Sequence, residues 1–149
     1  MQRWGRGRHR PVRFMRRDGV CLAAVLVLLT GCGGGAGAGH FDSPGGRVYL
    51  QNCVGCHGPT GQGMGAQPVL VGSATVNGPV PALTAWVLYG VRPTASPAGR
   101  YPALMPLFAA QPDADLAAVL TYLRSSWGHR SSAVTVADIQ AARAAHAAR

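Results

Sequence analysis

The chain has 149 residues and a formal net charge of +9, from 14 basic and 5 acidic residues, and this length allows one modest domain with a few additional segments. Half of the basic residues fall within residues 1–19, so the rest of the chain is far closer to neutral. A nucleic-acid-binding protein needs a basic stripe with aromatic residues between the charges. The sequence has no such stripe, and we therefore exclude nucleic acid as a partner.

Residues 1–31 have the pattern of an export signal. A basic segment covers residues 1–19, an apolar run extends from Val20 to Leu29, and small residues follow, which is the order of parts in a cleaved signal peptide. The apolar run is much shorter than the roughly 20 residues that a membrane-spanning helix needs. We therefore predict a signal peptide, with an uncleaved membrane anchor as the alternative.

The signal ends in Leu29-Thr30-Gly31-Cys32, which resembles the bacterial lipobox. This resemblance implies that the Cys32 thiol is acylated and that the mature protein is attached by this lipid to the periplasmic face of a membrane. Met15 begins a shorter segment with the same pattern, and we expect translation to start there. Residues 32–42 are rich in glycine, which predicts a flexible tether ahead of a domain at residues 43–149.

The first expected helix begins at Ser43-Pro44 and runs to about Asn52. Serine is a favoured N-cap, and proline suits the first helical position because its missing N–H is not needed there. After this helix, glycine and proline recur too often in residues 55–81 for a long regular element. We therefore expect an irregular loop over this stretch.

A short helix is expected over residues 81–90, with Leu83, Trp86 and Val87 on one face and Gly90 as its stop. Residues 91–108 contain four prolines and are predicted to form a second loop.

The strongest helical pattern covers residues 113–128, where Asp113 is a possible N-cap and Gly128 the expected end. Its apolar residues follow the spacing of one helix face, namely Leu116, Val119, Leu120, Leu123 and Trp127. Thr135 and Asp138 then resemble a capping box, which predicts a last, alanine-rich helix through about Ala147.

The expected domain is therefore all-α and rich in loops, since no stretch alternates apolar and polar residues as a strand would. A chain of this size with a few short helices has little apolar side-chain area around which to fold. We infer that a further apolar body fills its centre.

Cys53, Cys56 and His57 form the motif Cys-x-x-Cys-His, the attachment signal of c-type haem. Two thiols three residues apart on a turn project to the same side, where they can form thioethers with the two vinyl groups of one porphyrin. The adjacent histidine then directs an imidazole nitrogen at the iron. The predicted cofactor is one covalent haem c, with its iron bound by His57.

Two other interpretations of the motif compete with haem. A structural zinc site needs four ligands, usually two cysteine pairs, whereas one pair and one histidine stand here. A thioredoxin-like redox pair follows a strand in an α/β pattern, and no strand is expected. Cys21 and Cys32 belong to the signal, so the domain has only two cysteines, which is not a disulfide framework.

Met105 is the expected second axial ligand of the iron. It lies 48 residues after His57 in a proline-rich loop, far enough along the chain to reach the other face of a porphyrin, whereas Met64 lies too close to His57. A thioether ligand favours reduced iron and raises the reduction potential. Alternatively, Met105 only fills space in the core, and the second axial ligand is His129, His146 or water.

From Ser43 to about Gly128 the chain resembles a class I monohaem cytochrome c. Four pieces match in order: Gly45, Tyr49 and Cys53 fit the first-helix pattern, "CVGCHG" follows, then "PVLVG", and finally "MPLF" with "LAAVLTYLRSSWG". The resemblance implies that the Pro68 carbonyl orients the haem histidine. It also implies that the first and last helices of the family fold cross, with Gly45 and Tyr49 against Val119 and Tyr122.

The tail after residue 121 is similar to cytochromes that accompany dehydrogenases and to haem domains of nitrite reductases, although these usually read Trp-Gly-Asn where this chain has Trp127-Gly128-His129. The resemblance implies a single-electron carrier, not an enzyme, with redox proteins such as a dehydrogenase, oxidase or reductase as partners. One alternative is a fixed haem subunit of such a complex. The other is a haem sensor or a peroxidase-like enzyme, if Met105 does not bind iron.

Residues near the porphyrin can also be named. Arg92, Arg100 and Tyr101 are candidate donors to its propionates, with ordinary surface residues as the equal alternative. The apolar residues expected to line the pocket are Leu70, Leu83, Val87, Leu104, Phe108, Leu116 and Leu120.

Overall fold

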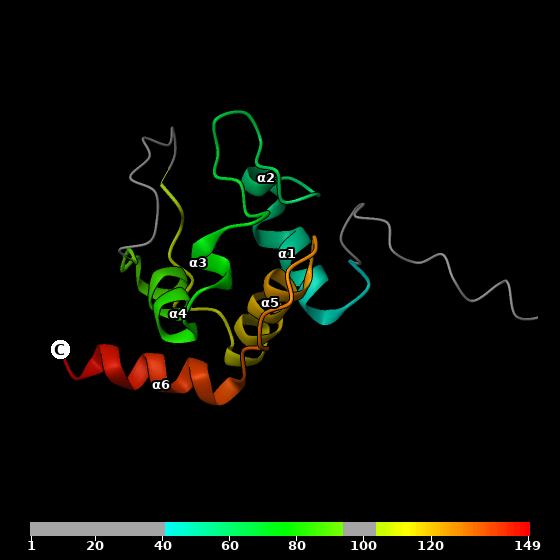
Figure 1. Cartoon of the computed structure of the whole chain (residues 1–149). Coiled ribbons are helices and arrows are strands. Elements are labelled where there is room, and N and C mark those ends of the chain that lie inside the picture. The colour runs from blue at the N-terminus through cyan, green and yellow to red at the C-terminus, as the bar shows by residue number, and fades with distance from the viewer. Residues whose placement is uncertain (1–40, 94–103) are drawn as a thin grey trace, which may run out of the picture. The chain divides into compact units, whose positions relative to one another are not determined.

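The computed structural model describes residues 41–93 and 104–149 (Figure 1). The expected signal peptide, the start at Met15, the lipid site at Cys32 and most of the tether lie outside the described residues, as do Arg100 and Tyr101. In the described part every regular element is a helix, as the all-α prediction requires. The order is α1 (Pro44–Asn52), α2 (Val54–His57), α3 (Ala74–Asn77), α4 (Val80–Tyr89), α5 (Asp113–Ser125) and α6 (Val136–Ala147).

Helix α1 begins where the sequence predicts. The Ser43 hydroxyl oxygen accepts a hydrogen bond from the Gly46 N–H at 3.0 Å, and Pro44 occupies the first turn. The helix ends at Asn52, and Cys53 caps it through its own N–H, which donates to the Tyr49 carbonyl. Cys53 is also the N-cap residue of α2, so the two helices share this cysteine.

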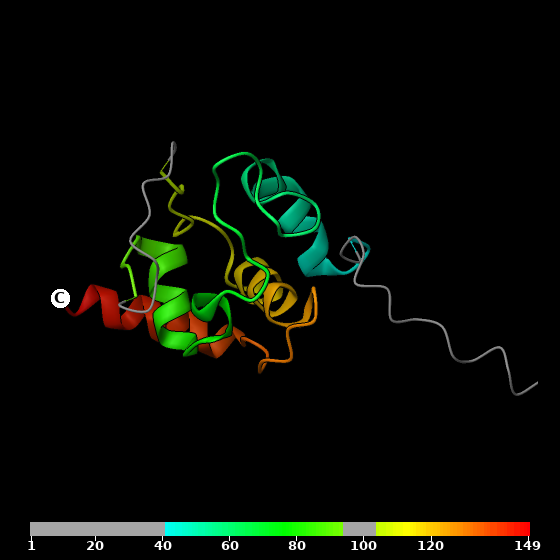
Figure 2. The same cartoon turned by 45° about the horizontal axis from the view of Figure 1, so that its top comes forward.

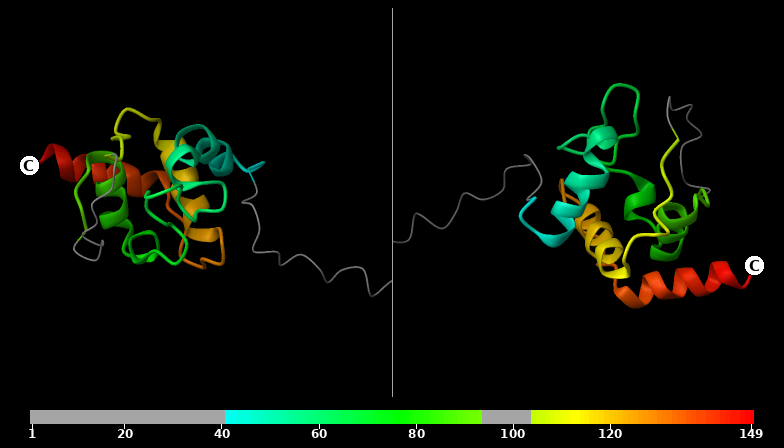
Figure 3. Two further views of the ribbon diagram at one scale, coloured as in Figure 1. Left: turned by 90° about the horizontal axis from the view of Figure 1, so that it is seen from above. Right: turned by 180° about the vertical axis from the view of Figure 1, so that it is seen from behind.

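Helices α1 and α5 pack directly on each other, as Figures 1 and 3 show. Gly45 lies so close to α5 that a Cβ atom there would be 2.1 Å from the Ala118 carbonyl oxygen and 2.7 Å from Tyr122 Cβ. The rings of Tyr49 and Tyr122 are 5.4 Å apart. Tyr122 therefore contacts α1 as the resemblance implies, and Ala118 also lies next to Gly45.

Helix α4 ends at the left-handed residue Gly90, with φ of 71°, as predicted. The stretch before it is more regular than expected, because two short helices interrupt the predicted loop. In α3 the side chain of Ser73 caps the first turn by accepting a bond from the Val76 N–H. A four-residue helix like this has no periodic apolar pattern, so the local cap was its only sequence signal.

Helix α5 differs from the prediction at both ends. Pro112 is its N-cap residue, and Asp113 is the first helical residue, whose carboxylate is instead paired with Arg143. The helix ends at Ser125, and Trp127 follows with a left-handed φ of 51°. Trp127 thereby leaves the helix axis and packs edge-on against the rings of Tyr49 and Tyr122.

Helix α6 contains the predicted capping box, with Thr135 and Asp138 bonded to each other through both side chains and backbone. It packs against α4 and α5, and Figure 2 shows it passing close to both. Ile139 is fully buried in this contact, and His146 stacks on Tyr89 with ring centroids 3.7 Å apart.

Candidate functional site

The two cysteines of the motif lie at the junction of α1 and α2. The backbone N–H groups of Cys56 and His57 both donate to the Cys53 carbonyl, so the motif forms one tight helical turn. Cys53 and Cys56 do not form a disulfide. Burial raises the pKa of the Cys53 thiol to about 11, with a smaller contribution from Cys56. A reactive thioredoxin-type pair needs a lowered thiol pKa, so this environment argues against that alternative.

The structure also offers no support for a zinc site. Among residues 41–93 and 104–149, no group of three or more His, Cys, Asp or Glu side chains is arranged to hold a metal ion. A structural zinc ion requires four such ligands in tetrahedral geometry.

The His57 imidazole is oriented by the residue that the family resemblance names. Its Nδ1 atom lies 2.9 Å from the Pro68 carbonyl oxygen. A carbonyl oxygen only accepts hydrogen bonds, so Nδ1 donates this bond, and in the neutral imidazole Nε2 is then the nitrogen with the lone pair. This is the arrangement that a neutral, metal-binding histidine uses. His57 is therefore held in the tautomer that an iron ligand requires.

The loop between His57 and Pro68 folds back tightly enough to make this bond. The Leu70 N–H donates to the Gly61 carbonyl at 2.7 Å, which closes the loop. Gly61 has a left-handed φ of 70°, and a Cβ atom there would come within 2.8 Å of the Trp127 ring. Any other residue at this position would push the loop away from α5.

A cavity of about 630 Å³ lies beside the motif, between α1, α3, α4, α5 and the segment around Met105. Its size is in the range of cofactor and ligand pockets. Cys53, Cys56, His57 and Pro68 line it on one side. All the apolar residues predicted to surround the porphyrin also line it, namely Leu70, Leu83, Val87, Leu104, Phe108, Leu116 and Leu120.

The cavity has features that the sequence analysis missed. Val48 and Asn52 of α1, Val76 of α3 and Trp86 of α4 also line it. Thr75 lines it too, and the Thr75 hydroxyl is buried there without a hydrogen-bond partner. Val48 and Asn52 share one helix face four residues apart, next to Cys53, and this spacing was the signal that could have identified them.

Met105 lines the same cavity as His57, with 38 % of its surface exposed. Its segment is joined to α4 by a hydrogen bond of 3.1 Å from the Phe108 N–H to the Val87 carbonyl. In Figures 1 and 3 this segment and α2 stand apart from each other. Met64, by contrast, does not line the cavity and is 52 % exposed.

The two alternative histidine ligands are both engaged elsewhere. His129 is 8 % exposed, its Nδ1 lies 2.8 Å from the Leu123 carbonyl oxygen, and its Nε2 accepts a hydrogen bond of 2.8 Å from the Gly72 N–H. Both ring nitrogens are thus used, and neither can bind iron without breaking a buried bond. His146 lies in its stack with Tyr89 at α6, away from the cavity lining.

Of the predicted propionate donors, only Arg92 is among the described residues. It lines the cavity, and its guanidinium carbon lies 5.1 Å from the centre of the Trp86 ring, which is a cation–π distance. Arg92 is therefore placed at the cavity, while Tyr101 and Arg100 lie outside the described residues.

Comparison with known proteins decides the family. Residues 43–127, more than half of the chain, match the family described as cytochrome c. The chain belongs to the cytochrome c family. It is 35 % identical over 113 residues to one cytochrome c-552 of Thermus thermophilus, covering 72 % of this chain and 71 % of that protein. A second cytochrome c-552 of Thermus thermophilus is 36 % identical over 93 residues, covering 58 % of this chain and 70 % of the relative.

Family membership confirms several predictions made from the sequence. This cytochrome is an all-α, monohaem electron-transfer protein that carries covalent haem c and exchanges electrons with redox proteins. Cytochromes c of this kind are typically exported proteins. The cavity, its apolar lining, the two cysteines and the oriented imidazole fit such a group. No helix among the described residues has the length and apolar character needed to cross a membrane.

Proposed function

We propose that this cytochrome is a single-electron carrier with one low-spin haem whose iron is bound by His57 and Met105. Cys53 and Cys56 would hold the porphyrin through thioether bonds. When bound, the haem supplies an iron that gains and loses one electron. One observation carries the proposal: Cys53, Cys56, His57 and Met105 all line a single, mostly apolar cavity.

The residues of the chain prepare this site in three ways. The Pro68 carbonyl fixes the His57 tautomer, so Nε2 is the nitrogen that faces a metal. Two protein ligands, His57 and Met105, would leave no position on the iron for a substrate. Arg92 at the cavity wall is a candidate partner of a propionate, since a guanidinium binds carboxylates well.

Replacement of Met105 tests the axial ligand. In the full-length holoprotein, Met105→Ala should abolish the methionine–iron charge-transfer absorption of the ferric protein and lower its reduction potential, because the thioether stabilises ferrous iron. Met64→Ala is the matched control, since Met64 is exposed and does not line the cavity. If Met105→Ala keeps the absorption unchanged, Met105 is not the ligand.

The same spectra distinguish the carrier from the alternative activities. A wild-type ferric protein with high-spin absorption, or a ferrous protein that readily binds carbon monoxide, would indicate a haem sensor or a peroxidase-like enzyme. A stable complex that co-purifies with a dehydrogenase, oxidase or nitrite reductase would indicate a fixed haem subunit.

We further propose that residues 1–31 are a lipoprotein signal with its start at Met15, that residues 32–42 are a tether, and that a lipid on Cys32 holds the domain at residues 43–149 on the periplasmic face of a membrane. A tethered carrier has a raised effective concentration near membrane-bound redox partners. Cys32→Ala should release the protein into the soluble periplasmic fraction, and Cys21→Ala is the control that should stay attached. Retention of Cys32→Ala in the membrane would show an uncleaved anchor instead.

A further inference from the structure

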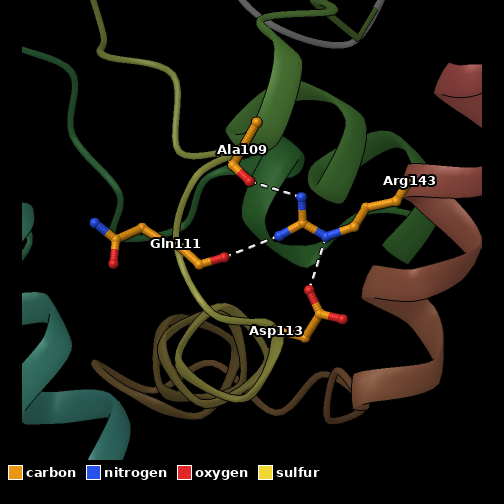
Figure 4. Close-up of polar contacts among 4 residues, drawn as sticks. All are labelled: Ala109, Gln111, Asp113 and Arg143. Atoms are coloured by element: carbon orange, nitrogen blue, oxygen red, sulfur yellow. Dashed lines mark hydrogen bonds and ion pairs between the residues drawn. The ribbon is translucent and has the colours of Figure 1, made fainter.

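Arg143 of α6 makes a set of bonds to a segment 30 to 34 residues away in the chain. Its Nε donates to the Asp113 carboxylate at 2.7 Å, and its two terminal nitrogens donate to the Ala109 carbonyl at 2.6 Å and the Gln111 carbonyl at 2.9 Å (Figure 4). The planar guanidinium thus binds three acceptors of one short segment. A lysine has one nitrogen and cannot match this fork.

The bound segment lies directly after Met105. Residues 109–113 connect the methionine loop to the start of α5, and the Gln111 N–H donates to the Phe108 carbonyl within it. Within the loop, Leu104 is 96 % and Leu107 is 64 % exposed, whereas Phe108 packs against the core. The Phe108 bond to α4 and the Arg143 bonds to α6 are further attachments of this part of the chain.

Arg143 also lies outside the part of the chain that matches the family. The match covers residues 43–127, whereas α6 spans Val136–Ala147. The helix is held in place independently of Arg143 by the buried Ile139 and by His146, which stacks on Tyr89 of α4. A helix beyond residues 43–127 thus reaches back to the segment that follows the Met105 loop.

We propose that Arg143 is a positioning residue for Met105, and that α6 uses it to keep the methionine loop closed against the cavity. This inference rests on the proposed function, in which Met105 is the second axial ligand. Two of the three bonds go to backbone carbonyls, so they restrict the path of the chain itself. Without them the segment from Phe108 to Asp113 gains freedom, and Met105 is displaced more easily by an external ligand.

The experiment uses full-length ferric holoprotein with imidazole as the displacing ligand. We compare the wild type with Arg143→Gln, Arg143→Lys and Thr135→Ala, the last of which weakens the cap of α6 but leaves the Arg143 bonds intact. Imidazole affinity is followed through loss of the methionine charge-transfer absorption. Amide hydrogen exchange at Phe108 and Gln111, and unfolding by guanidinium chloride, are measured on the same samples.

We expect Arg143→Gln to bind imidazole about tenfold more tightly, equivalent to about 1.4 kcal/mol, and to exchange the Phe108 and Gln111 amides faster. Arg143→Lys should also bind imidazole more tightly, by a smaller factor, because it keeps the charge but not the fork. Thr135→Ala should stay within about twofold of the wild type even though it loses stability to unfolding.

Two results would overturn the proposal. If Arg143→Gln exchanges its amides faster but binds imidazole within twofold of the wild type, the Arg143 bonds serve only the stability of α6. An equal rise in Thr135→Ala would show that any loss of stability loosens Met105. If the wild type has no methionine absorption at all, the axial assignment fails and this inference with it, and that outcome is visible before any variant is compared.

Discussion

The contact of Gly45 with α5 allows the effect of a single methyl group to be worked out. In Gly45→Ala the new Cβ would lie 2.1 Å from the Ala118 carbonyl oxygen and 2.7 Å from Tyr122 Cβ, whereas ordinary contacts begin at 3.4 Å. The nearest atom belongs to the backbone of a helix and cannot rotate aside. The two helices must therefore move apart by about 1 Å at this point.

Two opposing effects set the magnitude. Overpacking of a well-packed contact costs about 1–3 kcal/mol, and the rigid backbone places this site at the upper end. Alanine in a helix is more stable than glycine by about 1 kcal/mol, which offsets part of the cost. We expect Gly45→Ala to lower the free energy of unfolding by about 2 kcal/mol.

The assay is chemical unfolding of the holoprotein in urea, followed by far-ultraviolet circular dichroism. Gln51→Ala, at an exposed position of the same helix, is the matched control and should change stability by no more than about 0.5 kcal/mol. If Gly45→Ala is as stable as the wild type, the helices do not approach as closely as described and the reasoning is wrong.

Two further substitutions test buried polar groups. Tyr49→Phe removes the donor of a buried hydrogen bond of 2.6 Å to the Gly58 carbonyl and should cost about 1–3 kcal/mol in urea unfolding. Burial, followed by Cys53 and Tyr122, raises the pKa of Tyr49, so the folded protein holds this proton more tightly than the unfolded chain does. Wild-type stability should therefore fall as the pH rises above about 10, and it should fall less steeply in Tyr49→Phe. Arg124→Leu leaves the carbonyls of Val76, Gly78 and Ser132 without their buried donor. It should lower the free energy of unfolding in urea by about 3 kcal/mol or more. A loss below about 1 kcal/mol would show that water replaces the guanidinium.

The sequence was informative where the chemistry is local. Ser43, the Thr135–Asp138 box and Gly90 define helix ends through bonds within one turn, and the structure has these ends where they were expected. The five consecutive residues from Cys53 to His57 were enough to predict the cofactor. The pocket lining was also predictable, because apolar residues near a central cofactor coincide with the core.

What the sequence could not reveal depends on distant partners. Asp113 has the local pattern of a helix cap, but its carboxylate instead pairs with a residue 30 positions away, on a helix outside the family match. His129 is a possible iron ligand by residue type, yet both of its nitrogens are bonded to the backbone of Gly72 and Leu123. Neither contact leaves a periodic signal in the sequence.

The sharing of Cys53 between α1 and α2 limits how this part of the chain can change its length. Each added residue in a helix rotates everything beyond it by about 100°, so one insertion between Gly45 and Cys53 would turn both sulfurs away from the cavity while α1 stayed seated on α5. The glycine-rich stretch after His57 is a loop with no such rotational register. We expect natural insertions and deletions to be absent from α1 up to His57 and to occur in that loop only at the exposed Gly65 and Ala66, because Gly61 and Pro68 fix its two ends.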